Sequence, residues 1–126
     1  MNYQEIISVD ALAEVLRASE RQTVLFFKHS NTCGVSMRAF DEFRKYLQAP
    51  EGSQVRNCLI VIQSSRDVSD ELARLTGIRH ESPQAIIVSK GRAVWNDSHL
   101  AIKSGTLIEA VRQNSPFLMN TRSLCR

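Results

Sequence analysis

Hydrophobic positions along the chain follow two different patterns. Three short runs are almost wholly apolar, which is typical of strands buried on both faces of a sheet. They lie at residues 23–28, 58–62 and 84–89. Four other stretches repeat apolar residues at the spacing of one helix face. They lie at residues 9–18, 33 to about 48, 68–76 and 104–114. Strands and helices are therefore predicted to alternate along the chain.

Turn residues mark where several of these predicted helices and strands end. Gly77 follows the third helical stretch, where a left-handed residue commonly ends a helix. Lys90 and Gly91 separate the strand 84–89 from a further strand at 92–95, which predicts a hairpin. Tyr3–Ile7 is a candidate for a short first strand. Alternation predicts parallel pairing with helices on both faces, and the hairpin adds an antiparallel edge. The predicted fold class is α/β, a three-layer sandwich around a mixed sheet of four to five strands.

Composition and charge exclude several classes of protein. The chain has 126 residues, 43% hydrophobic and 23% charged, which is enough for one ordinary globular core. Its net charge of +3 comes from Lys and Arg residues scattered among acids, so no nucleic-acid interface is expected. No apolar run approaches the roughly 20 residues of a membrane span, and no secretory signal is visible. A cytoplasmic protein without membrane contact is expected.

Cys33 occupies a position suited to chemistry, between a buried strand and the helix that follows. Backbone N–H groups at a helix start lack partners, and the positive end of the helix dipole favours a thiolate over a thiol. Ser36 lies one turn further on the same face, where its hydroxyl is expected to donate to the sulfur. Cys-x-x-Ser thus stands where a redox protein would carry Cys-x-x-Cys. Position alone leaves a reactive and an inert cysteine equally open.

The other two cysteines give no disulfide framework or structural zinc spacing. Cys58 begins a predicted strand and is interpreted as a small core residue. Cys125 stands one residue from the C-terminus, and a resolving or dimerising role for it stays open.

A proline marks the second part of the candidate site. Pro83 stands directly before the apolar strand 84–89, a position where no ladder donor is lost. Trans is the commoner form of any single X–Pro bond. If the Ser82–Pro83 bond were cis, the carbonyl and amide of Ser82 would face the start of the Cys33 helix. They could then pair with the backbone of a substrate.

Taken together, these features resemble a known superfamily. The element order, with Cys-x-x-Ser at a helix start and Gly-Ile-Arg-x-x-x-Pro before a strand, resembles thioredoxins over about residues 3–113. Within it, Phe27-Lys-His-Ser-Asn-Thr-Cys-Gly-Val-Ser36, Phe40-x-x-Phe43 and His80-Glu-Ser-Pro-Gln84 resemble the monothiol bacilliredoxins. The resemblance implies a single thioredoxin-like domain over residues 1–115 and a short C-terminal tail at 116–126.

The same resemblance implies an activity. It suggests a monothiol thiol–disulfide oxidoreductase with a nucleophilic Cys33 and a supporting Ser36. A cis-Pro83 would stand beside the site, with Thr32, Gly34 and Ser82 as further substrate-binding residues. Bacillithiol or a similar small thiol would be the co-substrate, bacillithiolated client proteins the partners, and no metal or bound cofactor is implied. Gly34 departs from the proline usual in the family, which could mean a different thiol partner.

Two other functions stay open. Cys33-Gly-Val-Ser36 differs by one residue from the motif of glutaredoxin-like iron–sulfur carriers, but Asp97-Ser-His-Leu100 replaces the paired glycines that such proteins use for glutathione. A non-catalytic adaptor with the same fold is the third alternative.

The remaining candidate residues are weaker. His29, His80 and His99 show no metal-ligand spacing. His80 falls in a loop expected near Cys33 and is interpreted as a solvated loop residue, with an electrostatic role as the alternative. Lys28 is expected either to stabilise the thiolate or to point to water.

Overall fold

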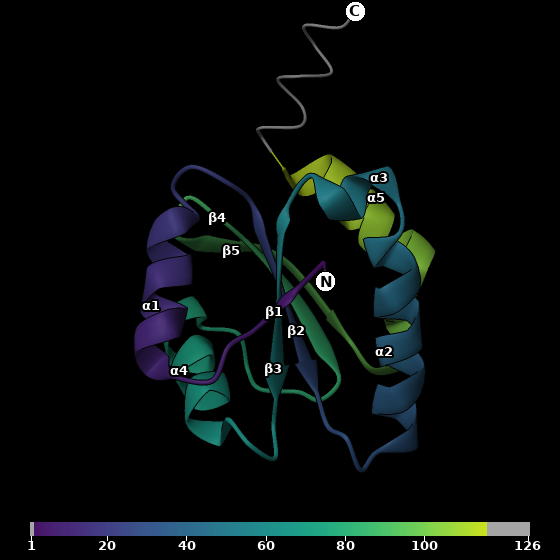
Figure 1. The fold of residues 1–126 in the computed structure, drawn as a ribbon, viewed down its shortest axis with the longest axis horizontal. Coiled ribbons are helices and arrows are strands. Elements are labelled where there is room, and N and C mark those ends of the chain that lie inside the picture. The colour runs from purple at the N-terminus through teal and green to yellow at the C-terminus, as the bar shows by residue number, and fades with distance from the viewer. Residues whose placement is uncertain (1, 116–126) are drawn as a thin grey trace, which may run out of the picture.

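A computed structural model of the chain describes residues 2–115 (Figure 1). Its elements follow the predicted order closely. They are β1 (Gln4–Glu5), α1 (Val9–Ala18), β2 (Val24–His29), α2 (Gly34–Leu47), α3 (Pro50–Ser53), β3 (Arg56–Val61), α4 (Arg66–Thr76), β4 (Gln84–Ser89), β5 (Arg92–Ser98), the 3-10 turn η1 (His99–Ala101) and α5 (Ser104–Asn114). The two short helical pieces α3 and η1 are additions that the hydrophobic pattern did not indicate. The predicted tail at 116–126, including Cys125, lies outside the described residues, and the boundary at residue 115 stays a prediction.

The five strands form one mixed sheet in the order β1-β3-β2-β4-β5. β1, β3 and β2 are parallel, whereas β4 runs antiparallel to both β2 and β5. The antiparallel hairpin is confirmed, but the parallel pairing expected for the strand after α4 is wrong. The segment 77–83 returns the chain to the end of the sheet where β2 finishes, so Gln84 at the start of β4 pairs with Lys28. The predicted mixed sheet of four to five strands is confirmed.

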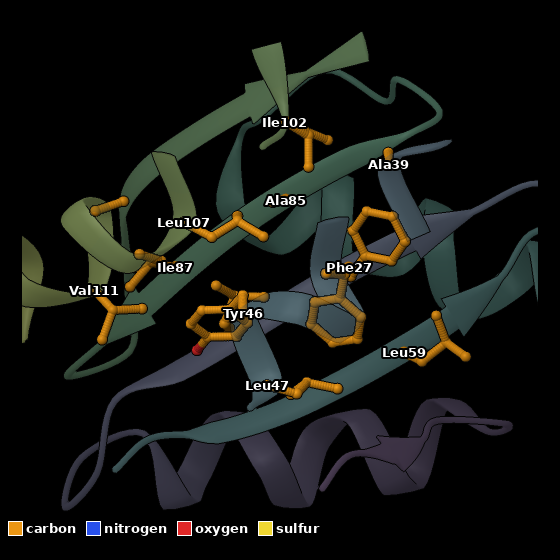
Figure 2. Packing of buried hydrophobic residues seen from close by; sticks show 13 residues of the cluster. Phe27, Ala39, Tyr46, Leu47, Leu59, Ala85, Ile87, Ile102, Leu107 and Val111 are labelled. Atoms are coloured by element: carbon orange, nitrogen blue, oxygen red, sulfur yellow. The ribbon is translucent and has the colours of Figure 1, made fainter. Parts of the chain in front are cut away.

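Helices cover both faces of the sheet and give the predicted three layers. α1 and α4 lie on one face, and α2, α3 and α5 lie on the other (Figure 1). Each face has its own apolar cluster, because successive residues of a buried strand point to opposite sides. Phe27 of β2 belongs to the cluster under α2 and α5 (Figure 2), and Phe26 belongs to the cluster under α1 and α4.

Local signals end the elements as the sequence indicated. Gly77 has a φ of +73° and ends α4 in the left-handed conformation. Lys90 and Gly91 have φ values of +53° and +77°, the two positive angles of a type I′ hairpin turn. No helix within residues 2–115 is long and apolar enough to cross a membrane.

Candidate active site

The site is built around the point where β2 ends and α2 begins. Cys33 is the N-cap of α2, with extended backbone angles (φ −114°, ψ 125°), and its carbonyl accepts the Met37 N–H at 3.0 Å. Its thiol is free and partly exposed. No side chain caps this end of α2. The positive end of the helix dipole is therefore open to a charge on the Cys33 sulfur.

Ser36 is fully buried, and its hydroxyl contacts the preceding loop. Its Oγ accepts the Ser30 N–H at 2.9 Å and shares a hydrogen bond with His29 Nδ1 at 2.9 Å. The bond from Ser36 to the Cys33 sulfur that the sequence suggested is not among its contacts. As the third residue of α2, Ser36 lies on the face packed against β2. Its hydroxyl therefore points toward the sheet.

His29 is the buried partner of this hydroxyl, a role that sequence reasoning missed. Its ring stacks on Phe40 of α2, with centroids 4.8 Å apart and planes 19° apart. Burial lowers the pKa of His29 below its ordinary value, which keeps the imidazole neutral at neutral pH. The available signal was its spacing of two from Phe27, which places both residues on the α2 side of the sheet.

Gln63 holds the same loop from outside and was also missed. Its Oε1 accepts the Asn31 N–H at 3.1 Å, and its Nε2 donates to Ser30 Oγ at 2.8 Å and Thr32 Oγ1 at 3.1 Å. One side chain thus binds the three residues that precede Cys33. Gln63 follows β3, whose carboxyl end meets that of β2 because the two strands are parallel.

The second half of the site comes from the loop before β4. The Ser82–Pro83 bond is cis, as the resemblance implied. Pro83 lies beside the end of β2, because the next residue pairs with Lys28. Within residues 2–115, the backbone N–H and carbonyl of Ser82 make no hydrogen bond, and its Oγ is buried without a partner. The predicted residues therefore gather at one end of the sheet, with Thr32, Cys33, Gly34 and Ser36 on one side and Ser82 and Pro83 on the other.

Comparisons with known proteins agree with this geometry. The family model described as monothiol bacilliredoxin BrxC matches residues 4–107. The chain belongs to the BrxC family. One solved structure, a protein with a thioredoxin fold and a provisional oxidoreductase assignment, is 34% identical, with a TM-score of 0.75 over 86% of this chain and 92% of that chain.

Two thioredoxins share only the fold. That of Malassezia sympodialis is 20% identical, with a TM-score of 0.71 over 88% of this chain and 89% of its own. That of Trypanosoma brucei brucei is 15% identical, with a TM-score of 0.71 over 88% of each chain. These two structures show the thioredoxin fold alone, and the redox oxidoreductase class of this chain comes from the BrxC family match.

Gly34 stands where the resemblance led us to expect proline. A Cβ atom placed on Gly34 would meet no atom within 4 Å beyond its own turn of the helix and its chain neighbours. Gly34 is the first residue of α2, a position that tolerates proline because its N–H has no partner inside the helix. Packing within the described residues therefore does not require glycine here.

Lys28 neither points to water nor turns toward Cys33, the two orientations expected for it. It is fully buried and turned toward α4, where Nζ donates to the Ser69 carbonyl at 3.1 Å and lies 3.4 Å from His80 Nδ1. Burial lowers the pKa of Lys28 to about 8, partly offset by the charge of Asp70. His80 is a half-buried loop residue, and it also shares a 3.1 Å hydrogen bond with Ser69 Oγ, a partner that the sequence did not indicate.

Cys58 takes the core role predicted for it. It is fully buried in the cluster under α1 and α4, and burial raises the pKa of its thiol to about 12. It lies on the opposite face of the sheet from α2. Across residues 2–115, no group of three or more His, Cys, Asp or Glu side chains is gathered as a metal site would need.

Proposed function

We propose that the protein removes bacillithiol, or a similar small thiol, from mixed disulfides on client proteins, with Cys33 as the nucleophile. The observation that carries this proposal is the placement of a partly exposed, free Cys33 thiol at the uncapped start of α2. A thiolate is stabilised at such a place, and the thiolate is the form that attacks disulfides. Membership in the BrxC family supports the same chemistry.

The reaction is a thiol–disulfide exchange. The Cys33 thiolate attacks the bacillithiol sulfur of the mixed disulfide, and a new bond forms between these two sulfurs. The bond between bacillithiol and the client cysteine breaks, and the client leaves as a thiolate that takes a proton from water. The client is thereby reduced, and Cys33 now holds the bacillithiol.

Release of the bacillithiol needs a second thiol. Ser36 cannot form a disulfide with Cys33, and Cys58 is buried on the other face of the sheet. We therefore expect the resolving thiol to come from another molecule or from Cys125. This thiol, as its thiolate, attacks the bacillithiol sulfur and forms a disulfide with it, while the bond to Cys33 breaks and Cys33 leaves as the free thiolate.

The backbone of Ser82 can form hydrogen bonds with the backbone of the client protein. Its N–H and carbonyl have no partner in the described chain and stand beside the cis-Pro83 at the same end of the sheet. An extended client segment can exchange hydrogen bonds with such a free backbone edge. Thr32 and Gly34, both exposed, border the sulfur on its other side.

The test uses a purified client carrying bacillithiol on one cysteine. At pH 7, intact mass spectrometry should show loss of bacillithiol from the client and its gain by this protein. Cys33→Ser should abolish the transfer, while Cys58→Ser, the matched control for a buried thiol, should retain most of it. Equal transfer by the Cys33 variant would overturn the proposal.

A further inference from the structure

A groove of about 270 Å³ lies between α2 and the connection from β5 to α5. We call it the α2–η1 groove. Val35 and Arg38 line it on the α2 side, and His99, Leu100 and Lys103 line it on the other. Pockets for drug-sized ligands begin at roughly 300 Å³. The groove is slightly smaller than that, so it suits one end of a small molecule.

The residues that line the α2–η1 groove do not include Cys33 or Pro83, but each wall holds a residue close to one of them. Val35 is two residues from Cys33, in the first turn of α2. On the other wall, the His99 N–H donates to the Pro83 carbonyl at 3.0 Å. His99 itself has a left-handed φ of +59°, and its Nε2 lies 2.9 Å from Glu81 Oε1. A molecule bonded to Cys33 could extend from the sulfur into this groove.

The carboxylates that line the groove already have partners. Glu42 binds Lys45 at 2.9 Å and accepts the Ser104 N–H at 2.8 Å, which lowers the pKa of this carboxyl. Asp41 lies 4.0 Å from Arg44. Glu42 is therefore occupied by two partners, whereas the exposed Asp41 only has a cation nearby.

Two of the lining cations are unpaired. Arg38 and Lys103 are exposed and make no ion pair or side-chain hydrogen bond with any residue in the range 2–115. They stand on opposite walls of the groove. A ligand with carboxylates would bind between them, since a guanidinium and an ammonium both donate to carboxylate oxygens.

We propose that the α2–η1 groove binds the carboxylate-bearing tail of the small thiol while its sulfur is bonded to Cys33, with Arg38 and Lys103 as the cations. This inference rests on the proposed function and names the class of small thiol that the site selects. The two malate carboxylates of bacillithiol give it a tail of this class. A neutral thiol of similar size would gain nothing from the two cations.

The test measures how fast Cys33 of the full chain reacts with two disulfides. One is bacillithiol disulfide, and the other is the same molecule with its malate carboxylates as methyl esters. In each reaction the Cys33 thiolate forms a disulfide with one half of the probe and releases the other half as a thiolate, which peptide mass spectrometry follows. The acid probe should react faster than the ester. Arg38→Glu/Lys103→Glu should lower the acid rate about tenfold or more and leave the ester rate within about twofold.

Arg17→Glu/Arg21→Glu is the matched control, because it makes the same change in net charge near the end of α1, on the other face of the sheet. This control should retain the preference for the acid probe. An equal loss of preference in both double variants, or no preference in the unaltered chain, would overturn the groove proposal alone. Failure of Cys33 to react with either probe would instead overturn the proposed function.

Discussion

Lys28 and His29 are neighbours at the end of β2, yet they serve opposite faces of the sheet. His29 points toward α2 and binds Ser36, whose hydroxyl also holds the Ser30 N–H. Lys28 points toward α4 and binds the Ser69 carbonyl and His80. The α2-side network ends at the loop that carries Cys33. The α4-side network ends three residues before Pro83, in the other loop of the site.

The two networks differ in charge. Burial keeps His29 neutral, so the α2-side network is held by ordinary hydrogen bonds. Lys28 is a fully buried amine whose bonded partners are a carbonyl and an imidazole, with no carboxylate within ion-pair distance in the described chain. A buried charge without a bonded counter-charge costs stability. We therefore expect changes on the α4 side to alter stability alone, and changes on the α2 side to alter the reactivity of Cys33 as well as stability.

The largest effect is expected for Lys28. Lys28→Ala should lower the free energy of unfolding by about 2 kcal/mol, because it leaves a cavity beside His80 and Ser69. Lys28→Met fills most of that volume without a buried charge and should stay within about 1 kcal/mol of the unaltered protein at pH 7. Urea unfolding measures both. An equally large loss in the Met variant would show that hydrogen bonds of the ammonium, rather than packing, support this face.

Stability should also respond to pH through Lys28. Its pKa is about 8 in the folded chain, against an ordinary value of 10.5. Between these values the unfolded chain holds a proton that the folded chain has released, so the free energy of unfolding rises with pH. Relative to Lys28→Met, the unaltered protein should gain about 1–2 kcal/mol between pH 7.5 and 9.5. A constant difference across this range would contradict the buried position of the amine.

On the α2 side, Ser36→Ala should cost about 1–2 kcal/mol, because the Ser30 N–H and His29 Nδ1 lose their shared partner. The loop before Cys33 should loosen, so that the start of α2 stabilises the Cys33 thiolate less well. Because the thiolate is the reactive form, iodoacetamide should alkylate Cys33 more slowly at pH 7. Ser53→Ala, an exposed serine far from Cys33 in the sequence, is the matched control and should change neither quantity. An unchanged alkylation rate in the Ser36 variant would remove this hydroxyl from the mechanism.

The smallest change in stability is expected for Gln63→Ala, a few tenths of a kcal/mol, because this side chain is exposed. Its local effect should be larger. The Asn31 amide, which donates to Gln63, should exchange its hydrogen several times faster, and the rate of Cys33 alkylation should change. Gln54→Ala, an exposed glutamine in the connection before β3, should leave both unchanged. Slow exchange at Asn31 in the Gln63 variant would show that the loop is held by other contacts.

Much of the fold was predictable because its signals are local. Wholly apolar runs gave the central strands, Gly77 ended α4, and Lys90-Gly91 marked the hairpin. The direction of β4 was not predictable in this way. It depends on the path of residues 77–83 back along the sheet, which no periodicity encodes.

In the candidate site, too, the sequence revealed the features with local signals and missed the contacts that depend on packing. Cys33 and Pro83 were recognisable because each stands at a junction between elements that the sequence itself marks. The partners of Lys28 and Gln63 were not, because those bonds join segments that only the folded sheet brings together. The partners of Ser36 are close in the chain, but they depend on how α2 packs against β2. Gln63 binds residues more than 30 positions away in the chain.

The sequence by itself determined most of the strands, helices and turns, though not α3 or η1, and which cysteine begins a helix. Hydrophobic spacing and backbone preferences act over a few residues, so they can be recognised locally. The tertiary structure decided which way each side chain at the end of β2 faces and what it binds. Strand pairing and helix packing set those contacts, and both depend on residues far apart in the chain.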